Sequence, residues 1–588
     1  MRHAVRAAGA GLLPALAALG GGELAAGLLG PRSSPLVAVG GTVIDLTPTP
    51  VKEFAVSAFG TYDKLVLIGT IIIVLLAAAV LLGFLAAAGR RAWAAAGVAG
   101  LGALGALAAG TRPAAVPLDV VPSLVAAGVG ALTLLLLTRA ATGTAPPSKD
   151  TGAAPSKDIK TTLPKNTGTA PSKDSGTAPA KNTRTTPPKD TGAEPAKNSG
   201  TTLPKNSGTT LPKNIGAAPP KNIEAAPVEG DEVLSDRGTA PSASHRRAFL
   251  LTGAGAGAAF AAGRLLSSRV PAATELALPA PASPARPLPA GTDLRVPGLS
   301  PFVTPAADFY RVDTALVVPR PDLASWTLRV HGTRTIELTM ADVLRRGLIE
   351  RDITLTCVSN EVGGPYAGNA RWLGVPLPVL LREAGVPAGA DQLLSTSADG
   401  WTCGTPIEIV MDGRDAMLAV GMNGRALPAE RGFPARLLVP GLYGYVSATK
   451  WVVDLRLTRY ADERAYWTER GWAVDAPVKT MSRIDVPAPL ERLPAGTVRV
   501  AGVAWAQHRG VAAVEVRVDG GPWQEATLAA TPGPDTWRQW TWTWRATSGT
   551  HTLESRATDA TGSVQRSSRV TPFPDGATGW HSVVVTVA

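Results

Sequence analysis

Long apolar runs with almost no charged residues dominate the first 140 residues. The four runs are residues 7–31, 65–89, 92–111 and 120–138. A bilayer-spanning helix needs about 20 apolar residues, so the pattern predicts transmembrane helices over 1–140, with a cleaved signal peptide as the alternative for the first run. Glu23 is the one charge within that run, and its off-centre position favours a helix-packing or interfacial role over a polar site inside the membrane.

Arginines flank these runs unevenly. Arg2 and Arg6 precede the first run, Arg90 and Arg91 follow the second, and Arg139 follows the fourth. Positive residues concentrate on the cytoplasmic side of membrane proteins, so the amino terminus and the segment after the fourth run are expected in the cytoplasm. The six histidines all lie outside the runs and no CxxCH motif occurs, so we expect no haem on this chain.

Residues 141–243 form a low-complexity linker. A lysine recurs at intervals of eight from Lys149 to Lys221, in units such as SGTTLPKN and TGTAPSKD. These units contain almost no large apolar side chains and cannot offset the entropy of ordering, which predicts a disordered Pro/Thr/Lys segment. Residues 142–227 hold twelve Lys/Arg against six Asp/Glu, so +6 of the net charge of +11 arises here, which argues against a nucleic-acid-binding surface.

Paired arginines open the next segment, residues 244–264. Arg246 and Arg247 precede a modestly apolar stretch, a pattern that resembles a twin-arginine export signal. A fifth transmembrane helix is the alternative. Both interpretations place everything after this segment outside the cytoplasm. Residues 265–300 are rich in proline and alanine and read as a spacer.

From residue 301 the pattern becomes globular. Residues 301–484 mix strand-like runs such as WTLRVHG with the helix-like TMADVLRRG, which predicts an α+β domain. Residues 485–588 alternate polar and apolar positions in AAVEVRVDGGPW and HSVVVTVA, with glycine turns between strands, which predicts an antiparallel β-sandwich. The expected fold is therefore multi-domain: an α-helical membrane bundle, an α+β domain and a sandwich.

Cysteine is scarce, with two residues in 588, Cys357 and Cys403. Cys357 ends an apolar, β-branched run, ITLTC, and precedes a polar turn with glycines. A thiol there suits a soft-metal ligand or a nucleophile. A nucleophile needs a nearby histidine, and His331 is the only one in 301–484. Two more interpretations of Cys357 are a buried inert side chain and a disulfide with Cys403.

Four stretches, taken in order, resemble the sulfite oxidase family of molybdopterin-dependent oxidoreductases. They are DFYRVD (Asp308 to Asp313), TLTCVSNEVGG around Cys357, NARWLGVPLPVLL (Asn369 to Leu381) and RLLVPGLYGYVSATKWV (Arg436 to Val452). The resemblance covers about residues 285–588. It implies a molybdenum–molybdopterin cofactor with the Cys357 thiolate as metal ligand, and a C-terminal immunoglobulin-like dimerisation domain, which is compatible with a homodimer.

The resemblance also implies roles for nine further residues. Donors to the phosphate and pterin of the cofactor are expected from Tyr310, Arg311, Ser397, Arg436, Ser447 and Lys450. Asn360, Arg371 and Asp399 are expected with Cys357 in the catalytic pocket. For Arg436 and Lys450 the alternative is a surface ion pair, which their apolar surroundings disfavour, and Tyr310 has a core position as its alternative.

The implied activity is a two-electron oxygen-atom transfer on the extracytoplasmic side of the cell membrane. The substrate is left open between a small oxyanion and a sulfoxide, because animal and plant sulfite oxidases have arginines soon after the cysteine, whereas here Glu361, Val362 and Gly363 follow Asn360. A separate cytochrome or quinone-linked partner would exchange the electrons. The alternative from another class is a non-catalytic exported binding or adhesion protein on the same fold, and a third interpretation makes the helical bundle a docking module.

Overall fold

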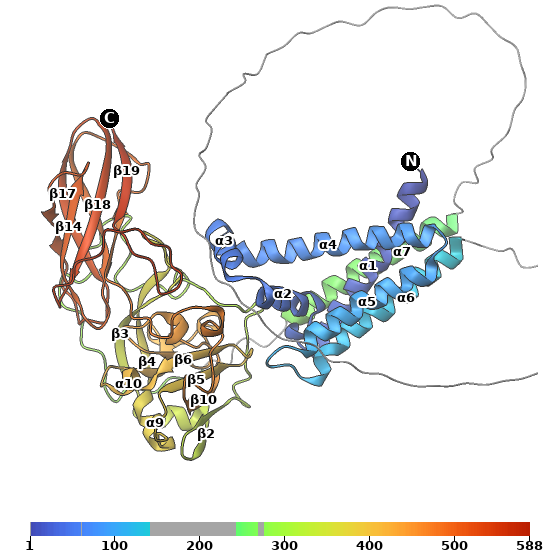
Figure 1. Ribbon diagram of the computed structural model, residues 1–588, viewed down its shortest axis with the longest axis horizontal. Coiled ribbons are helices and arrows are strands. Elements are labelled where there is room, and N and C mark those ends of the chain that lie inside the picture. Colours follow the sequence, from blue (N-terminus) through green and yellow to red (C-terminus); the bar gives the residue numbers. More distant parts are fainter. Residues whose placement is uncertain (1, 60–61, 142–242, 269–275) are drawn as a thin grey trace, which may run out of the picture. The chain divides into compact units, whose positions relative to one another are not determined.

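The computed structural model describes four stretches of the chain: residues 2–59, 62–141, 243–268 and 276–588 (Figure 1). Nearly all of the predicted 141–243 linker, and residues 269–275 of the predicted 265–300 spacer, lie outside the described residues.

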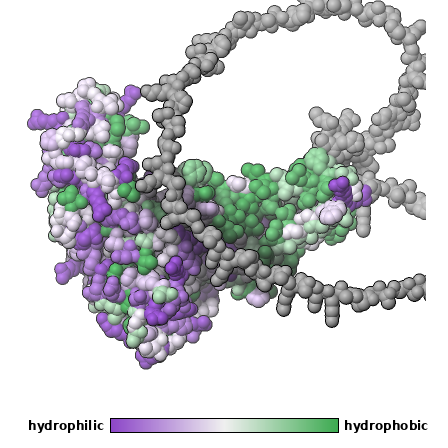
Figure 2. Space-filling view, viewed as in Figure 1, coloured by the Kyte–Doolittle hydropathy of each residue, from purple (hydrophilic) through white to green (hydrophobic). Residues whose placement is uncertain are grey.

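The amino-terminal region is helical. Its helices are α1 (Arg2–Leu29), α2 (Pro35–Leu46), α3 (Thr49–Phe59), α4 (Asp63–Ala87), α5 (Arg91–Gly110) and α6 (Val121–Ala141). Within the described residues, four helical segments are long and apolar enough to cross a membrane, Ala7–Leu29, Asp63–Ala87, Arg91–Gly110 and Pro117–Leu137, and they coincide with the four predicted runs. These helices present an apolar surface (Figure 2), on which Ile73 and Leu81 of α4 are each 68% exposed. The shorter helices α2 and α3 were not predicted.

Helix α7 (Ala243–Ser268) begins at the predicted twin-arginine segment and packs on α1. A Cβ placed on Gly20 would lie 2.5 Å from the carbonyl oxygen of Ala256, and one on Gly27 would lie 2.7 Å from that of Gly263. Small residues thus let the two helix backbones approach closely. Glu23 is 2% exposed and accepts a hydrogen bond from Ser34 Oγ, which agrees with the predicted helix-packing role.

The α+β domain contains two sheets. Strands of the first, in the order β2-β1-β10-β5-β6, are β2 (Thr335–Thr339), β1 (Thr327–His331), β10 (Val452–Thr458), β5 (Gln392–Ser397) and β6 (Thr402–Pro406). Strands of the second, in the order β3-β4-β7-β8, are β3 (Ile349–Thr356), β4 (Ala367–Pro376), β7 (Met417–Met422) and β8 (Arg425–Ala426), and β9 (Arg436–Leu438) pairs with β7. The helices are α8 (Met340–Leu344), α9 (Leu377–Ala384) and α10 (Ile407–Met411). The predicted strand WTLRVHG and helix TMADVLRRG are confirmed as β1 and α8.

Two further sheets form the C-terminal domain. The first, in the order β11-β13-β17-β16, contains β11 (Met481–Val486), β13 (Gly496–Trp505), β17 (Arg538–Ala546) and β16 (Thr527–Leu528). The second, in the order β12-β19-β18-β14-β15, contains β12 (Arg492–Leu493), β19 (His581–Val587), β18 (Gly549–Asp559), β14 (Val511–Val518) and β15 (Gln524–Glu525). Residues of both sheets, among them Val500, Trp540, Leu553 and Val585, share one apolar core. The predicted strands are confirmed, and the immunoglobulin-like assignment stays a prediction.

The α+β domain and the C-terminal domain are joined by a continuous core. Trp505 and Trp537 of the C-terminal domain belong to the same buried apolar cluster as Val358 and Val362, which follow Cys357. Strand β11 begins at Met481, before the predicted domain boundary at residue 485. The C-terminal domain therefore packs close to the loop that begins at Cys357.

Candidate functional site

Cys357 directly follows strand β3 and opens a tight loop. Its N–H donates to the carbonyl of Tyr366 (2.9 Å), and the N–H of Asn360 donates back to the carbonyl of Cys357 (3.1 Å). The Asn360 Oδ1 accepts from the N–H of Tyr366 (2.8 Å), which closes the loop. Both Cys357 and Cys403 are buried free thiols, so the disulfide interpretation is wrong.

The surroundings of Cys357 do not suit a free nucleophile. Burial raises the pKa of its thiol, and hydrogen bonds from Ser359 only partly oppose this. The histidine that a Cys/His hydrolase would need is committed elsewhere, because His331 Nε2 lies 2.7 Å from Asp454 Oδ2. A buried thiol of this kind becomes a stable thiolate when a cation sits beside it.

A cavity beside Cys357 brings together most of the predicted site residues. The predicted residues that line it are Tyr310, Arg311, Cys357, Ser397, Asp399, Arg436 and Lys450. Ser397 ends β5 and Arg436 begins β9, while the others lie in four loops, one of which follows β3, so only the folded domain assembles them.

Three predicted residues lie outside the lining of this cavity. Arg371 on β4 pairs with Asp352, with 2.8 Å between Nη2 and Oδ2. The Ser447 hydroxyl donates to the carbonyl of Tyr443 (3.0 Å). Asn360, as described above, holds the cysteine loop. Asn360 and Ser447 hold loops next to the cavity, whereas Arg371 pairs with Asp352 and does not take the place in the pocket that the resemblance implied.

Two predicted cations of the cavity, Arg436 and Lys450, are largely shielded from solvent. Arg436 is 6% exposed, lies 5.3 Å from the ring centroid of Trp372, and donates from Nη1 to the carbonyl of Arg431 (3.2 Å). Burial lowers the pKa of Arg436 to about 10, so it stays charged at neutral pH. Because Arg436 and the Lys450 side chain (11% exposed) are both buried, the surface-ion-pair alternative is wrong. Arg436 has no carboxylate partner among the described residues, and a buried cation of this kind favours an anionic ligand.

Lys450 and Arg311 share one carboxylate. Lys450 Nζ lies 2.5 Å from Asp313 Oδ2, and Arg311 Nε lies 2.8 Å from the same oxygen. Burial lowers the pKa of Lys450 to about 8, against the opposing effect of Asp313. The cluster carries more positive than negative charge and can accept a phosphate.

Within the α+β domain, three polar atoms of residues that line the cavity are buried without a hydrogen-bond partner among the described residues. They are Ser397 Oγ, Trp401 Nε1 and Trp472 Nε1. Buried donors left unpaired are costly, so they mark where a bound molecule supplies acceptors. A ligand with ring nitrogens, carbonyl oxygens and a phosphate, as molybdopterin has, fits this donor set.

Sequence reasoning missed several residues of the site. Trp401 lies close in sequence to the predicted Ser397 and Asp399, but no sequence pattern marked it as a site residue. Arg431 donates to three backbone carbonyls, those of Ala306, Ala307 and Tyr310, and so fixes the segment that leads to Tyr310.

Comparisons with known proteins agree with this geometry. Residues 315–467 match the family model described as "Oxidoreductase molybdopterin binding domain". The chain is 28% identical over 289 residues to sulfite oxidase of Gallus gallus, covering 41% of this chain and 62% of the relative. It is 28% identical over 296 residues to mitochondrial sulfite oxidase of Homo sapiens, covering 42% of this chain and 52% of the relative.

Two further matches come from different proteins. The chain is 28% identical over 301 residues to an inducible NADH nitrate reductase of Glycine max, covering 41% of this chain and 34% of the relative. The crystal structure of the sulfane dehydrogenase SoxCD from Paracoccus pantotrophus matches with 26% identity and a TM-score of 0.42, over 49% of this chain and 84% of that chain. The chain thus spans between a third and two thirds of the length of these curated relatives.

Proposed function

We propose that this chain, a molybdenum-cofactor oxidoreductase of the sulfite oxidase family, catalyses two-electron oxygen-atom transfer at a molybdenum ion bound by Cys357. The observation that carries the proposal is one cavity in which a buried thiol, buried cations and three unpaired donors face the same space. Molybdopterin, when bound, supplies the metal at which oxygen and electrons are exchanged. The protein supplies binding, orientation and exclusion of water.

Each residue of the cavity has a distinct task in this proposal. Cys357 provides the thiolate, which burial disfavours until the metal is present. Arg436 and Lys450 bind the phosphate of the cofactor through charge-assisted hydrogen bonds. Ser397 and Trp401 donate to the pterin, which satisfies their unpaired atoms.

The balanced reaction is substrate plus water giving oxidised substrate, two protons and two electrons, or its reverse. The substrate class is a small oxyanion or a sulfoxide. The cysteine loop carries an exposed Glu361 and a buried Val362, so this loop supplies no cation to an anionic substrate. Electrons pass to or from a separate cytochrome or quinone-linked carrier.

We further propose that the chain is anchored in the cell membrane with its catalytic domain outside the cytoplasm. The apolar helices and the distribution of arginines around them support this arrangement. The close contacts of Gly20 and Gly27 with α7 favour its retention beside α1 over a cleaved signal, although α7 is not among the four described helices apolar enough to span a membrane. A homodimer formed through the C-terminal domain follows from the family resemblance.

Metal analysis tests the proposal. The full-length chain is purified in detergent from a host that makes molybdopterin, and molybdenum per chain is measured by mass spectrometry together with the visible spectrum. About one molybdenum per chain is expected. Cys357→Ser should remove or shift the sulfur-to-metal absorption, whereas Cys403→Ser, a buried free thiol on β6, should leave it unchanged. A well-folded wild-type chain without molybdenum would contradict the proposal and favour a non-catalytic binding protein.

A further inference from the structure

Strand β3, which leads directly to Cys357, lies at the edge of its sheet. The order β3-β4-β7-β8 gives it a single partner strand, β4. An edge strand has unpaired backbone groups that proteins usually cover. At the start of β3 the N–H of Glu350 donates to the carbonyl of Ser283 (2.9 Å). Near its end the C-terminal domain takes over: the N–H of Thr354 donates to the carbonyl of Asp535 (2.9 Å), and the Thr354 side-chain Oγ1 accepts from the N–H of Trp537 (2.7 Å).

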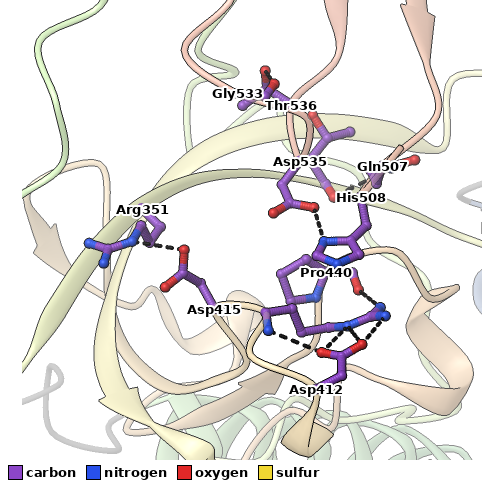
Figure 3. Close-up of polar contacts among 11 residues, drawn as sticks. Arg351, Asp412, Asp415, Pro440, Gln507, His508, Gly533, Asp535 and Thr536 are labelled. Atoms are coloured by element: carbon purple, nitrogen blue, oxygen red, sulfur yellow. Dashed lines mark hydrogen bonds and ion pairs between the residues drawn. The ribbon is translucent and has the colours of Figure 1, made fainter. Parts of the chain in front are cut away.

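Gln507, from the loop after β13, reaches Thr356, the residue next to the cysteine. Its Nε2 donates to Thr356 Oγ1 (2.8 Å) and lies 3.4 Å from the carbonyl oxygen of Thr354. Gln507 and Thr356 are each 1% exposed, so water does not compete for this bond. Figure 3 shows Gln507 beside His508 and Asp535, in the loops that meet the α+β domain. Because Thr356 directly precedes Cys357, the Gln507 amide constrains the backbone that carries the sulfur.

The C-terminal domain also contacts the other side of the cysteine loop. Arg483 on β11 donates from Nη1 to the carbonyl of Gly364 (2.9 Å). The ring of His581 lies so close to Gly363 that a Cβ there would be 2.2 Å from it, and Gly363 has a positive φ of 82°. The loop from Cys357 to Gly364 is thus held at both ends by one domain.

We propose that Gln507 is a positioning residue, through which the C-terminal domain fixes the orientation of the Cys357 sulfur toward the metal. This inference rests on the proposed function, and it assigns the C-terminal domain a task at the active site in addition to any role in dimerisation. Gln507 acts through Thr356 and need not touch substrate or cofactor.

A double-mutant cycle tests the route through Thr356. Gln507→Leu removes the donor and Thr356→Val removes the acceptor, while both keep the approximate shape of the buried side chains. The readout is the electron paramagnetic resonance spectrum of molybdenum(V), whose g-values report ligand geometry, with kcat and KM beside it. Each single variant should shift the g-values and lower kcat about tenfold with little change in KM, and the double variant should equal the single ones, because residues that act as one unit are not additive.

His508→Ala is the matched control, since His508 is the next residue and pairs with Asp535, with 3.2 Å between Nδ1 and Oδ1 (Figure 3). It should leave the spectrum and kcat unchanged. A Gln507→Leu enzyme with wild-type spectrum and kcat would overturn the inference. So would additive effects in the double variant, because they would separate Gln507 from Thr356.

A second measurement does not depend on the cofactor. In the full-length chain made without molybdenum, on a Cys403→Ser background, the rate of Cys357 alkylation by iodoacetamide reports how firmly the loop is held. Gln507→Leu should raise this rate about tenfold over that of His508→Ala, if opening of the loop limits access. Equal rates in the two variants would refute the positioning role even if the wild-type chain binds no molybdenum.

Discussion

Asp313 and Lys450 form a buried ion pair in which the carboxylate and ammonium groups approach to 2.5 Å. Their side chains are 7% and 11% exposed, and Arg311 binds the same carboxylate. Although burial opposes ionisation, Lys450 holds the pKa of Asp313 well below its usual range. The pair fixes the position of a lysine that the proposed phosphate would share with Asp313.

The Lys450 charge predicts a pH-dependent affinity for the cofactor. With a pKa of about 8, the ammonium is present below that pH and is lost as pH rises through it. Molybdenum retained by the chain after dialysis should therefore fall between pH 7 and pH 9. Lys450→Arg keeps its charge over this range and should abolish the decrease. An equal decrease in both proteins would show that another group titrates.

Replacing Asp313 should lower the stability of the folded chain more than it changes binding of the phosphate. Asp313→Asn removes the carboxylate that Lys450, Arg311 and Lys64 share, and breaking the well-shielded pair with Lys450 costs about 3 kcal/mol or more. We expect a clear decrease in the free energy of unfolding of the cofactor-free chain, measured by chemical denaturation in detergent. Asp462→Asn, which breaks the exposed pair with Arg459, should have no measurable effect. An Asp313→Asn chain as stable as the wild type would mean that other groups stabilise these cations.

The two predicted serines should respond in opposite ways. Ser397 Oγ has no partner among the described residues, whereas Ser447 Oγ donates to the carbonyl of Tyr443 (3.0 Å). Ser397→Ala should leave the cofactor-free chain as stable as wild type or slightly more so, because an unsatisfied buried hydroxyl costs about 1 kcal/mol or more, yet it should weaken cofactor retention.

Ser447→Ala is the matched variant. It should lower the melting temperature, measured by thermal unfolding, and leave molybdenum content per folded chain unchanged. If Ser397→Ala retained the cofactor as firmly as wild type, the free hydroxyl would not be a donor to the pterin.

The sequence was sufficient to predict the helices, the main strands and much of the site, because these depend on local patterns. Cys357 and Arg436 lie at strand ends or within apolar strands, where a polar side chain is conspicuous. Arg371 shows why a sequence neighbour of a site residue need not reach the site. Alternate residues of β4 face opposite sides of the sheet, so Trp372 is buried in the core while Arg371 pairs with Asp352. Gln507 could not have been found, since its link to Thr356 exists only once the two domains pack together.

His581 makes the cysteine loop sensitive to acid. Burial lowers the pKa of its imidazole to about 4, with Arg483 and Arg569 acting in the same direction and Asp485 opposing them. Between pH 4 and its ordinary value near 6.5, the unfolded chain binds a proton that the folded chain does not. The contribution of His581 to the free energy of unfolding is therefore fully present above about pH 6.5, and it decreases as pH falls toward 4, by up to about 3 kcal/mol.

Thermal unfolding of the chain from pH 7 to pH 4.5 measures this loss. His581→Gln keeps an acceptor for the N–H of Ile484, which now donates to His581 Nδ1 (2.9 Å), and does not titrate, so its unfolding should depend less on pH. His551→Gln should not reduce the acid loss, because a hydrogen bond to Asp519 raises the pKa of His551 and gives the opposite sign. Because His581 packs on Gly363, the wild-type chain should also lose molybdenum over the same acidic range. If the His581→Gln chain lost as much molybdenum, this histidine would not be linked to the cysteine loop.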